Sequence, residues 1–170
     1  MKEKYSIMYD SLTGNTKLLG ESIETYLGKD NCEYCGYITN KIMSSDILFI
    51  GFWTNMGTCT TEMSDLLSTI HDKKIFLFGT AGYSGNIGYF NIVLNRVKEY
   101  IPADNTIIGE FMCQGRMQTT VKDRYEKILK KEPSNIEFQE LLKRYNLALE
   151  HPNKTDIDKL KETIENIKNN

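Results

Sequence analysis

Long apolar runs and a surplus of charge are both missing from this sequence. No stretch is apolar over a length that could cross a membrane, and residues 1–4, Met-Lys-Glu-Lys, lack the apolar core of a signal peptide. The 21 basic and 23 acidic residues are mixed along the chain and leave a formal net charge of −2. Nucleic-acid-binding proteins normally carry a basic patch. We therefore expect a cytoplasmic protein with no membrane partner and no nucleic-acid partner.

Two common nucleotide-binding motifs are absent as well. The P-loop spacing of Gly, four residues, Gly-Lys and then Ser or Thr does not occur, and no Gly-x-Gly-x-x-Gly follows the first apolar segment. These absences disfavour a nucleoside triphosphate and NAD as resident ligands. The two histidines, His71 and His151, have no Ser or Cys partner in a recognisable catalytic motif. We predict that both are structural or solvent-exposed, and we assign no catalytic residue.

Cysteines are few, at positions 32, 35, 59 and 113, and a cytosolic chain would normally keep them reduced. Cys32 and Cys35 form a Cys-x-x-Cys, but the residues after it resemble a strand, whereas a thioredoxin-like dithiol opens a helix. A zinc site would need a second pair or a nearby histidine. We expect packing cysteines and no metal site.

The remaining composition is that of a globular protein. Of its 170 residues, 40% are hydrophobic and 26% are charged. A chain of this length and composition can form a hydrophobic core without disulfides or a structural metal. No repeat or low-complexity linker divides the chain. We therefore predict a single domain over residues 1–170.

Five strand-like segments alternate with amphipathic helical patterns in the first two thirds of the chain. The segments lie near residues 4–10, 33–38, 46–51, 73–79 and 106–112. The third and fourth are continuous apolar runs, as expected of parallel strands covered on both faces, whereas the polar second segment suits a sheet edge. Alternating strands and helices predict a doubly wound parallel sheet with helices on both faces.

After Met117 the sequence is helical to its end, with apolar stripes at helical spacing. We expect the first helix of this region to complete the sandwich around the sheet. Residues 132–170 are then predicted to be a helical C-terminal extension packed on the domain, because their stripes are too regular for a disordered tail.

The turn after the first strand, residues 11–16, has the chemistry of a phosphate cradle. Ser11, Thr13 and Thr16 offer hydroxyl donors, Gly14 lets the backbone curl close to a ligand, and the N–H groups of the next helix point into the same concavity. A simple strand-to-helix cap is the alternative interpretation.

Two further loops follow the third and fourth strands. Residues 51–59 contain Trp53, the only tryptophan of the chain, and residues 79–88 are rich in glycine. An aromatic ring can stack on a flat ligand, and a Gly-rich backbone can approach one closely. Ligands of open α/β sheets bind at the carboxyl ends of the strands, so we expect the three loops to meet in one pocket. Residues 113–116, after the fifth strand, border its outer edge in this arrangement and are assigned no role.

The turn Ser11-Leu12-Thr13-Gly14-Asn15-Thr16 resembles the FMN phosphate loop of the flavodoxin family, which runs Ser or Thr, any residue, Thr-Gly, any residue, Thr. The resemblance implies a flavodoxin-like three-layer sandwich, a five-stranded sheet in the order 2-1-3-4-5 with extra C-terminal helices, and FMN as cofactor. The acidic Gly-Asp and aromatic pattern of many flavodoxins is missing from the third loop. By resemblance, the residues expected to bind the cofactor are Ser11, Leu12, Thr13, Gly14, Asn15, Thr16, Phe52, Trp53, Thr54, Asn55, Met56, Gly57, Thr80, Ala81, Gly82, Tyr83 and Tyr89.

Three functions remain open from the sequence. The first is an electron carrier, monomeric or weakly dimeric, that serves a separate redox partner protein, either a reductase or an oxidase. The second is an NAD(P)H-dependent FMN quinone or nitro reductase on the same fold, and the third is a binding module without FMN.

Overall fold

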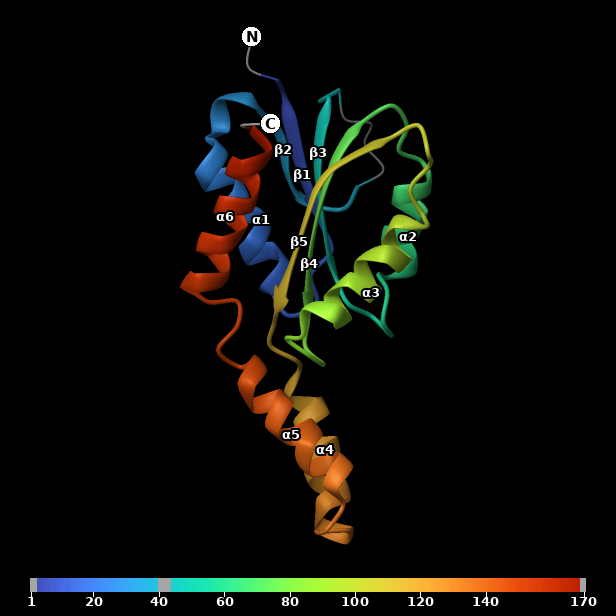
Figure 1. Ribbon diagram of the computed structural model, residues 1–170, viewed down its shortest axis with the longest axis vertical. Helices are drawn as coiled ribbons and strands as arrows, with labels where there is room; N and C mark the ends of the chain where they lie inside the picture. The colour runs from blue at the N-terminus through green and yellow to red at the C-terminus, as the bar shows by residue number, and fades with distance from the viewer. Residues whose placement is uncertain (1–2, 40–43, 169–170) are drawn as a thin grey trace.

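A five-stranded parallel sheet forms the centre of the molecule (Figure 1). The computed structural model describes residues 3–39 and 44–168. Residues 1 and 2, which belong to the segment tested above for a signal peptide, lie outside the described residues. The strand order β2-β1-β3-β4-β5 confirms the predicted flavodoxin-like order. The strands are β1 Tyr5–Tyr9, β2 Cys32–Tyr37, β3 Ile47–Trp53, β4 Lys74–Ala81 and β5 Thr106–Gln114.

Helices cover both faces of the sheet, as the alternating pattern predicts. Helices α1 (Asn15–Leu27) and α6 (Lys154–Lys168) lie on one face, and α2 (Thr61–Ser68) and α3 (Ile87–Lys98) lie on the other (Figure 1). Each pair encloses its own apolar cluster against the strands. No helix in the described part of the chain combines the length and apolarity needed to cross a membrane.

Burial along the strands follows their place in the sheet. All five residues of β1 are buried, and β3 and β4 are buried over most of their length. Both faces of these strands meet helices, and β3 and β4 have the continuous apolar runs expected of such strands. Strand β2 lies at an edge and is only half-buried, which agrees with its polar sequence. Cys32 and Cys35 lie on β2 against the α1 and α6 side of the core, and burial raises the pKa of Cys35 to about 12.

Two glycine and phenylalanine pairs join β3 to β4. Gly51 lies opposite Phe78, and Phe52 lies opposite Gly79. A Cβ atom on Gly51 would lie 2.3 Å from the Phe78 ring, and one on Gly79 would lie 2.8 Å from the Phe52 ring. Each ring therefore fills the space that its glycine leaves empty. Because adjacent residues of a strand face opposite sides, Phe78 enters the core under α1 and α6, and Phe52 enters the core under α2 and α3.

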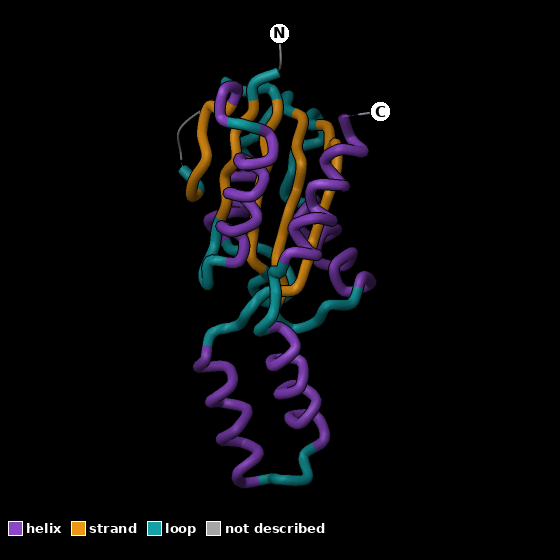
Figure 2. The backbone as a smooth tube through the Cα atoms, turned by 90° about the vertical axis from the view of Figure 1, so that its left-hand side faces the viewer, coloured by secondary structure: helices purple, strands orange, loops and turns teal. Residues whose placement is uncertain are grey.

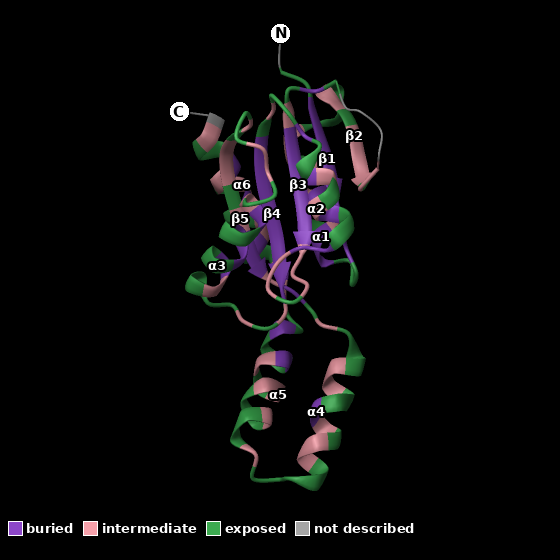
Figure 3. Ribbon diagram, turned by 90° about the vertical axis from the view of Figure 1, so that its right-hand side faces the viewer, coloured by how far each residue is buried: buried purple, intermediate pink, exposed green. Residues whose placement is uncertain are grey.

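The prediction for the C-terminal region is wrong about which helix completes the sandwich. Helices α4 (Thr119–Lys131) and α5 (Ile136–Ala148) form an antiparallel hairpin that projects from the carboxyl end of the sheet (Figures 2 and 3). They pack mainly on each other, whereas α6 returns to pack on β5 and α1. The apolar stripe of α4 packs on the apolar stripe of α5. The helical periodicity predicted for this region is therefore correct, but the prediction that its first helix packs on the sheet is wrong.

Matched leucine substitutions on α6 and α4 test this arrangement. Leu160 of α6 is fully buried between α6 and the sheet, and Leu129 of α4 is half-buried in the hairpin. We expect Leu160→Ala to lower the free energy of unfolding by roughly 2–4 kcal/mol, because it leaves a cavity in a closed core. Leu129→Ala should cost about 1 kcal/mol, since solvent can reach the site. Urea unfolding followed by circular dichroism measures both, and equal losses would contradict the packing of α6.

Candidate functional site

The three loops chosen from the sequence meet in one cleft of about 580 Å³ at the carboxyl ends of β1, β3 and β4. These strands are neighbours in the sheet, so the turns that follow them share one edge. The residues selected from the sequence that line the cleft are Leu12, Thr13, Asn15, Trp53, Thr54, Met56, Gly57, Thr80, Gly82, Tyr83 and Tyr89.

The first wall of the cleft is the turn that opens α1. Gly14 is the N-cap residue, and its φ of 82° lies in the left-handed region that favours glycine. Ser11 Oγ accepts a hydrogen bond from the Lys17 N–H at 3.1 Å. The N–H groups of Asn15 and Thr16 find no acceptor within the described chain. Two free N–H groups at the amino end of a helix form a site for an anion.

Asn15 has a buried side-chain oxygen that is unpaired among the described residues. Its Nδ2 donates to Thr13 Oγ1 at 2.7 Å and to the Arg116 carbonyl at 2.8 Å. Its Oδ1 is buried and, among the described residues, has no hydrogen-bond partner. Leaving such an oxygen unpaired costs free energy that a ligand hydroxyl would recover. Because Thr13 Oγ1 already accepts a bond, its own proton is free for a phosphate oxygen. The N–H and hydroxyl donors fit a phosphate, and the Asn15 Oδ1 acceptor fits a hydroxyl group on the chain attached to it.

Thr16 has a structural role below the cleft. Its Oγ1 lies 3.0 Å from Thr80 Oγ1, and both side chains are buried. This hydrogen bond joins α1 to the end of β4. The Thr16 hydroxyl is thus engaged inside the protein, and only the Thr80 side of the pair lines the cleft.

Trp53 is oriented by a carboxylate that sequence reasoning missed. Asp10 Oδ2 accepts a hydrogen bond from Trp53 Nε1 at 3.1 Å and another from Thr60 Oγ1 at 2.7 Å. Thr60 is also the N-cap of α2, where its side chain accepts from the Met63 N–H. Asp10 therefore links the end of β1, the end of β3 and the start of α2. Its position directly before the phosphate-type turn was the only available signal in the sequence.

The loop after Trp53 forms a tight turn. Asn55 and Thr58 exchange two backbone hydrogen bonds, of 2.8 and 3.0 Å. Met56 and Gly57 at its tip have φ values of 50° and 83°, a conformation that is costly for the non-glycine residue. Arg96 Nη1 of α3 donates to the Gly57 carbonyl at 3.2 Å and holds the turn in place. The Met56 side chain is 95% exposed at the mouth of the cleft.

Two tyrosines after β4, Tyr83 and Tyr89, also line the cleft. The Tyr83 and Tyr89 rings lie 5.5 Å apart between centroids, in a tilted arrangement. The guanidinium of Arg144, from α5, lies 5.1 Å from the Tyr83 ring centroid. Burial raises the pKa of Tyr89 above its ordinary value, so its phenol stays neutral at pH 7.

Some residues selected from the sequence lie elsewhere. Phe52 and Ala81 lie in the core between the sheet and helices α2 and α3, because their side chains point to that face of the sheet. The residues of the three loops that shape the cleft from behind, without lining it, are Ser11, Gly14, Thr16 and Asn55.

A fourth wall was not assigned a role from the sequence. It comes from the segment between β5 and α4 and from the first turn of α4, and its residues are Gly115, Arg116, Met117, Gln118 and Val121. The Gly115 N–H donates to the Ala81 carbonyl at 3.1 Å, which brings the segment against β4. The end of β5 was predicted at the same sheet edge, but no residue pattern there pointed to a ligand.

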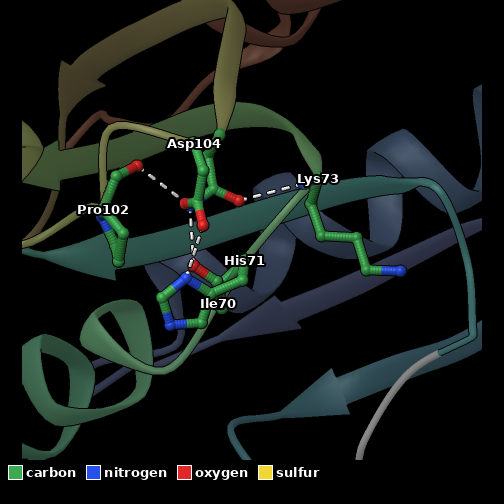
Figure 4. Close-up of polar contacts among 6 residues, drawn as sticks. Ile70, His71, Lys73, Pro102 and Asp104 are labelled. Carbon is green, nitrogen blue, oxygen red and sulfur yellow. Dashed lines mark hydrogen bonds and ion pairs between the residues drawn. The ribbon is translucent and has the colours of Figure 1, made fainter.

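Both histidines lie outside the cleft lining, paired with carboxylates. His71 Nδ1 is 2.7 Å from Asp104 Oδ2 at the amino end of β4, the opposite end of the sheet from the cleft (Figure 4). His151 Nδ1 is 2.6 Å from Asp156 Oδ2 at the start of α6. No group of three or more His, Cys, Asp or Glu side chains that could hold a metal occurs in residues 3–39 and 44–168.

Comparison with known proteins agrees with the fold. A family model described as a flavodoxin domain matches residues 6–165. The flavodoxin-like domain-containing protein BilS of Clostridioides difficile is 34% identical over 159 residues, which cover 91% of this chain and 90% of the relative. Two solved structures share the fold. The flavodoxin of Streptococcus pneumoniae has a TM-score of 0.55 at 14% identity and covers 97% of both chains. A flavoprotein of Lactobacillus acidophilus in complex with FMN has a TM-score of 0.52 at 15% identity, over 73% of this chain and 99% of the other.

The hydrogen bond between Asp10 and Trp53 predicts a change in tryptophan fluorescence. Asp10→Ala removes the acceptor of the indole N–H, so the ring should become more mobile and more solvated. We expect a red-shifted emission and a lower anisotropy from the only tryptophan of the chain. Asp10→Asn keeps an oxygen at the same place and serves as the matched control. If Asp10→Ala and Asp10→Asn gave the same spectrum as the unsubstituted protein, the carboxylate would not orient Trp53.

Proposed function

The chain belongs to the flavodoxin family, and from this premise we propose that it binds FMN in the cleft and carries electrons to or from a redox partner protein. One observation carries the proposal: a phosphate-type turn, a buried and unpaired amide oxygen, and an oriented tryptophan lie along one cleft. FMN offers the matching groups, namely a phosphate, a hydroxylated chain and a flat aromatic ring. A structural neighbour that was solved with FMN supports the choice.

Different residues of the cleft are suited to different parts of FMN. The free N–H groups at the start of α1 and the Thr13 hydroxyl are suited to the phosphate, and Asn15 Oδ1 is suited to a ligand hydroxyl. Trp53 and Tyr83 supply aromatic surface. Bound FMN would supply the electron chemistry, while the polypeptide sets its environment through stacking, N–H donors and burial.

The ionisable groups of the cleft favour a carrier over an enzyme. Among the described lining residues, only Tyr83, Tyr89 and Arg116 can ionise, and none of them is a carboxylate, imidazole, amine or thiol. Proton transfer in catalysis normally uses a group whose pKa lies near the working pH. The cleft offers no such group, whereas a carrier needs only an exposed mouth. The exposed apolar side chains Leu12 and Met56 provide contact surface there.

An absorption spectrum separates the three candidate functions. We expect the purified protein to take up FMN and become yellow, and dithionite to reduce it in two separate one-electron steps. Rapid oxidation of NADPH with a quinone as acceptor would favour the reductase instead. A colourless protein that ignores added FMN would contradict both and leave the binding module.

Removing the Thr13 hydroxyl tests the phosphate site. We expect Thr13→Val to weaken FMN binding by about 1.5–3 kcal/mol, or roughly 10- to 100-fold in Kd, because it loses a hydrogen bond to a charged group. Quenching of FMN fluorescence measures the affinity. Thr25→Val, an exposed site at the far end of α1 where the hydroxyl bonds only to the Glu21 carbonyl, is the matched control. Equal affinities of the two variants would place the phosphate elsewhere.

A further inference from the structure

The α4–α5 hairpin has few partners within its own chain. Tyr125, Tyr145 and Ala148 are its buried side chains, and the Tyr125 ring meets Phe138 edge-on at 5.8 Å. Its remaining side chains are half-buried or exposed, as Figure 3 shows along both helices. Two helices can cover only one stripe of each other. Much of this hairpin surface is therefore available to another molecule.

One face of the hairpin is basic. Helix α4 carries five basic and two acidic residues, although the whole chain has a net charge of −2. Lys122 pairs with Glu126 at 3.5 Å. The exposed side chains of Arg124, Lys127, Lys130 and Lys131, here called the basic stripe, have no carboxylate within 4.0 Å in the part of the chain that the structure describes. Their spacing of three, four and seven residues places them on one side of the helix.

The base of the hairpin is also a wall of the cleft. Met117, just before α4, and Val121, in its first turn, line the cleft, and Arg144 of α5 lies over the Tyr83 ring. The exposed apolar side chains of Leu12 and Met56 lie at the same mouth. A molecule that docks along the hairpin would thus also cover the opening of the cleft.

We propose that the hairpin is the docking arm for an acidic redox partner protein, which the basic stripe attracts and which the apolar mouth of the cleft then contacts. This proposal rests on the proposed function. The opposite charge of the partner follows from the stripe, since unpaired exposed cations steer anionic surfaces toward them. Apolar contact at the mouth adds the short-range attraction that charge alone does not supply.

A membrane or a nucleic acid fits the hairpin less well. Both present a nearly uniform negative surface. The hairpin, however, also carries acidic side chains: Asp123 and Glu132 flank the basic stripe, and Glu137 and Glu140 are exposed on α5. A protein can match such a mixed pattern with discrete charges of its own. The exposed Leu147, at 60%, and Ile136, at 74%, on α5 are likewise suited to a folded surface.

Binding of a small acidic redox protein tests the proposal without using electron transfer as the readout. The probe is zinc-substituted rubredoxin, which is diamagnetic, titrated into the isotope-labelled FMN-loaded protein at low ionic strength and followed by NMR. We expect shifts in the amides of α4, α5 and the cleft loops. Lys127→Glu with Lys131→Glu should raise the Kd by about tenfold or more, an effect that salt removes.

The control has the same net charge. Lys4→Glu with Lys159→Glu reverses two exposed lysines that are unpaired in the described chain and lie outside the hairpin. This control should change the Kd by no more than about twofold. Lys127→Gln with Lys131→Gln should give an intermediate loss, and circular dichroism verifies that α4 stays helical. Equal effects of the hairpin and control variants would overturn the proposal, as would the absence of shifts in α4 and α5.

Two further titrations test whether the hairpin binds a basic protein or a membrane instead of an acidic protein. Stronger binding of the basic cytochrome c at the hairpin would overturn the predicted charge of the partner. Hairpin binding to phosphatidylglycerol vesicles without binding to rubredoxin would assign the arm to a membrane. FMN affinity, measured separately, should be the same in all variants. If the protein took up no FMN but still bound rubredoxin through the hairpin, the cofactor assignment would fail and the docking arm would stand.

Discussion

Parallel pairing of β1, β3 and β4 is the constraint on which the candidate site depends. The register places Tyr9 beside Gly51 and Trp53 beside Thr80, so three strands end together and three turns open at one edge. The glycine and phenylalanine pairs between β3 and β4 keep the backbones close while each ring fills a core on one face. The turns carry local hydrogen bonds of their own, such as the pair between Asn55 and Thr58. Their positions come from the strands beneath them.

Polar contacts then convert this edge into a shaped cleft. The Thr16–Thr80 bond holds the start of α1 against the end of β4, and Asp10 holds Trp53 and Thr60 together. Arg96 fixes the strained turn at Gly57 from α3. In contrast, the N–H groups at the start of α1 and Asn15 Oδ1 have no partner among the described residues. The structure thus satisfies the groups that shape the cleft and leaves open those that would meet a ligand.

The hairpin projects from the sandwich, and its two helices pack mainly on each other (Figure 2). Residues 115–118 join β5 to the hairpin and line the cleft, as does Val121 in the first turn of α4, before the hairpin extends away from the sheet (Figure 1). Its charge differs from that of the whole chain, and its contact with Tyr83 connects it to the site. These properties explain how one segment can both line the cleft and reach toward another molecule.

Local sequence was sufficient for the strands and the phosphate-type turn, whereas the strand order was predicted from the resemblance to the flavodoxin family. A buried parallel strand requires a continuous apolar run, and a helix start that holds an anion requires glycine and hydroxyl residues in a short turn, so both leave a local pattern. The packing partner of a helix leaves no such pattern. The stripes of α4 and α6 look alike in sequence, yet one meets another helix and the other meets the sheet. The bond from Asp10 to Trp53 and the unpaired oxygen of Asn15 likewise depend on residues far apart in the chain. Only the tertiary structure decided them, because contacts between distant segments are set by the packing of the whole core.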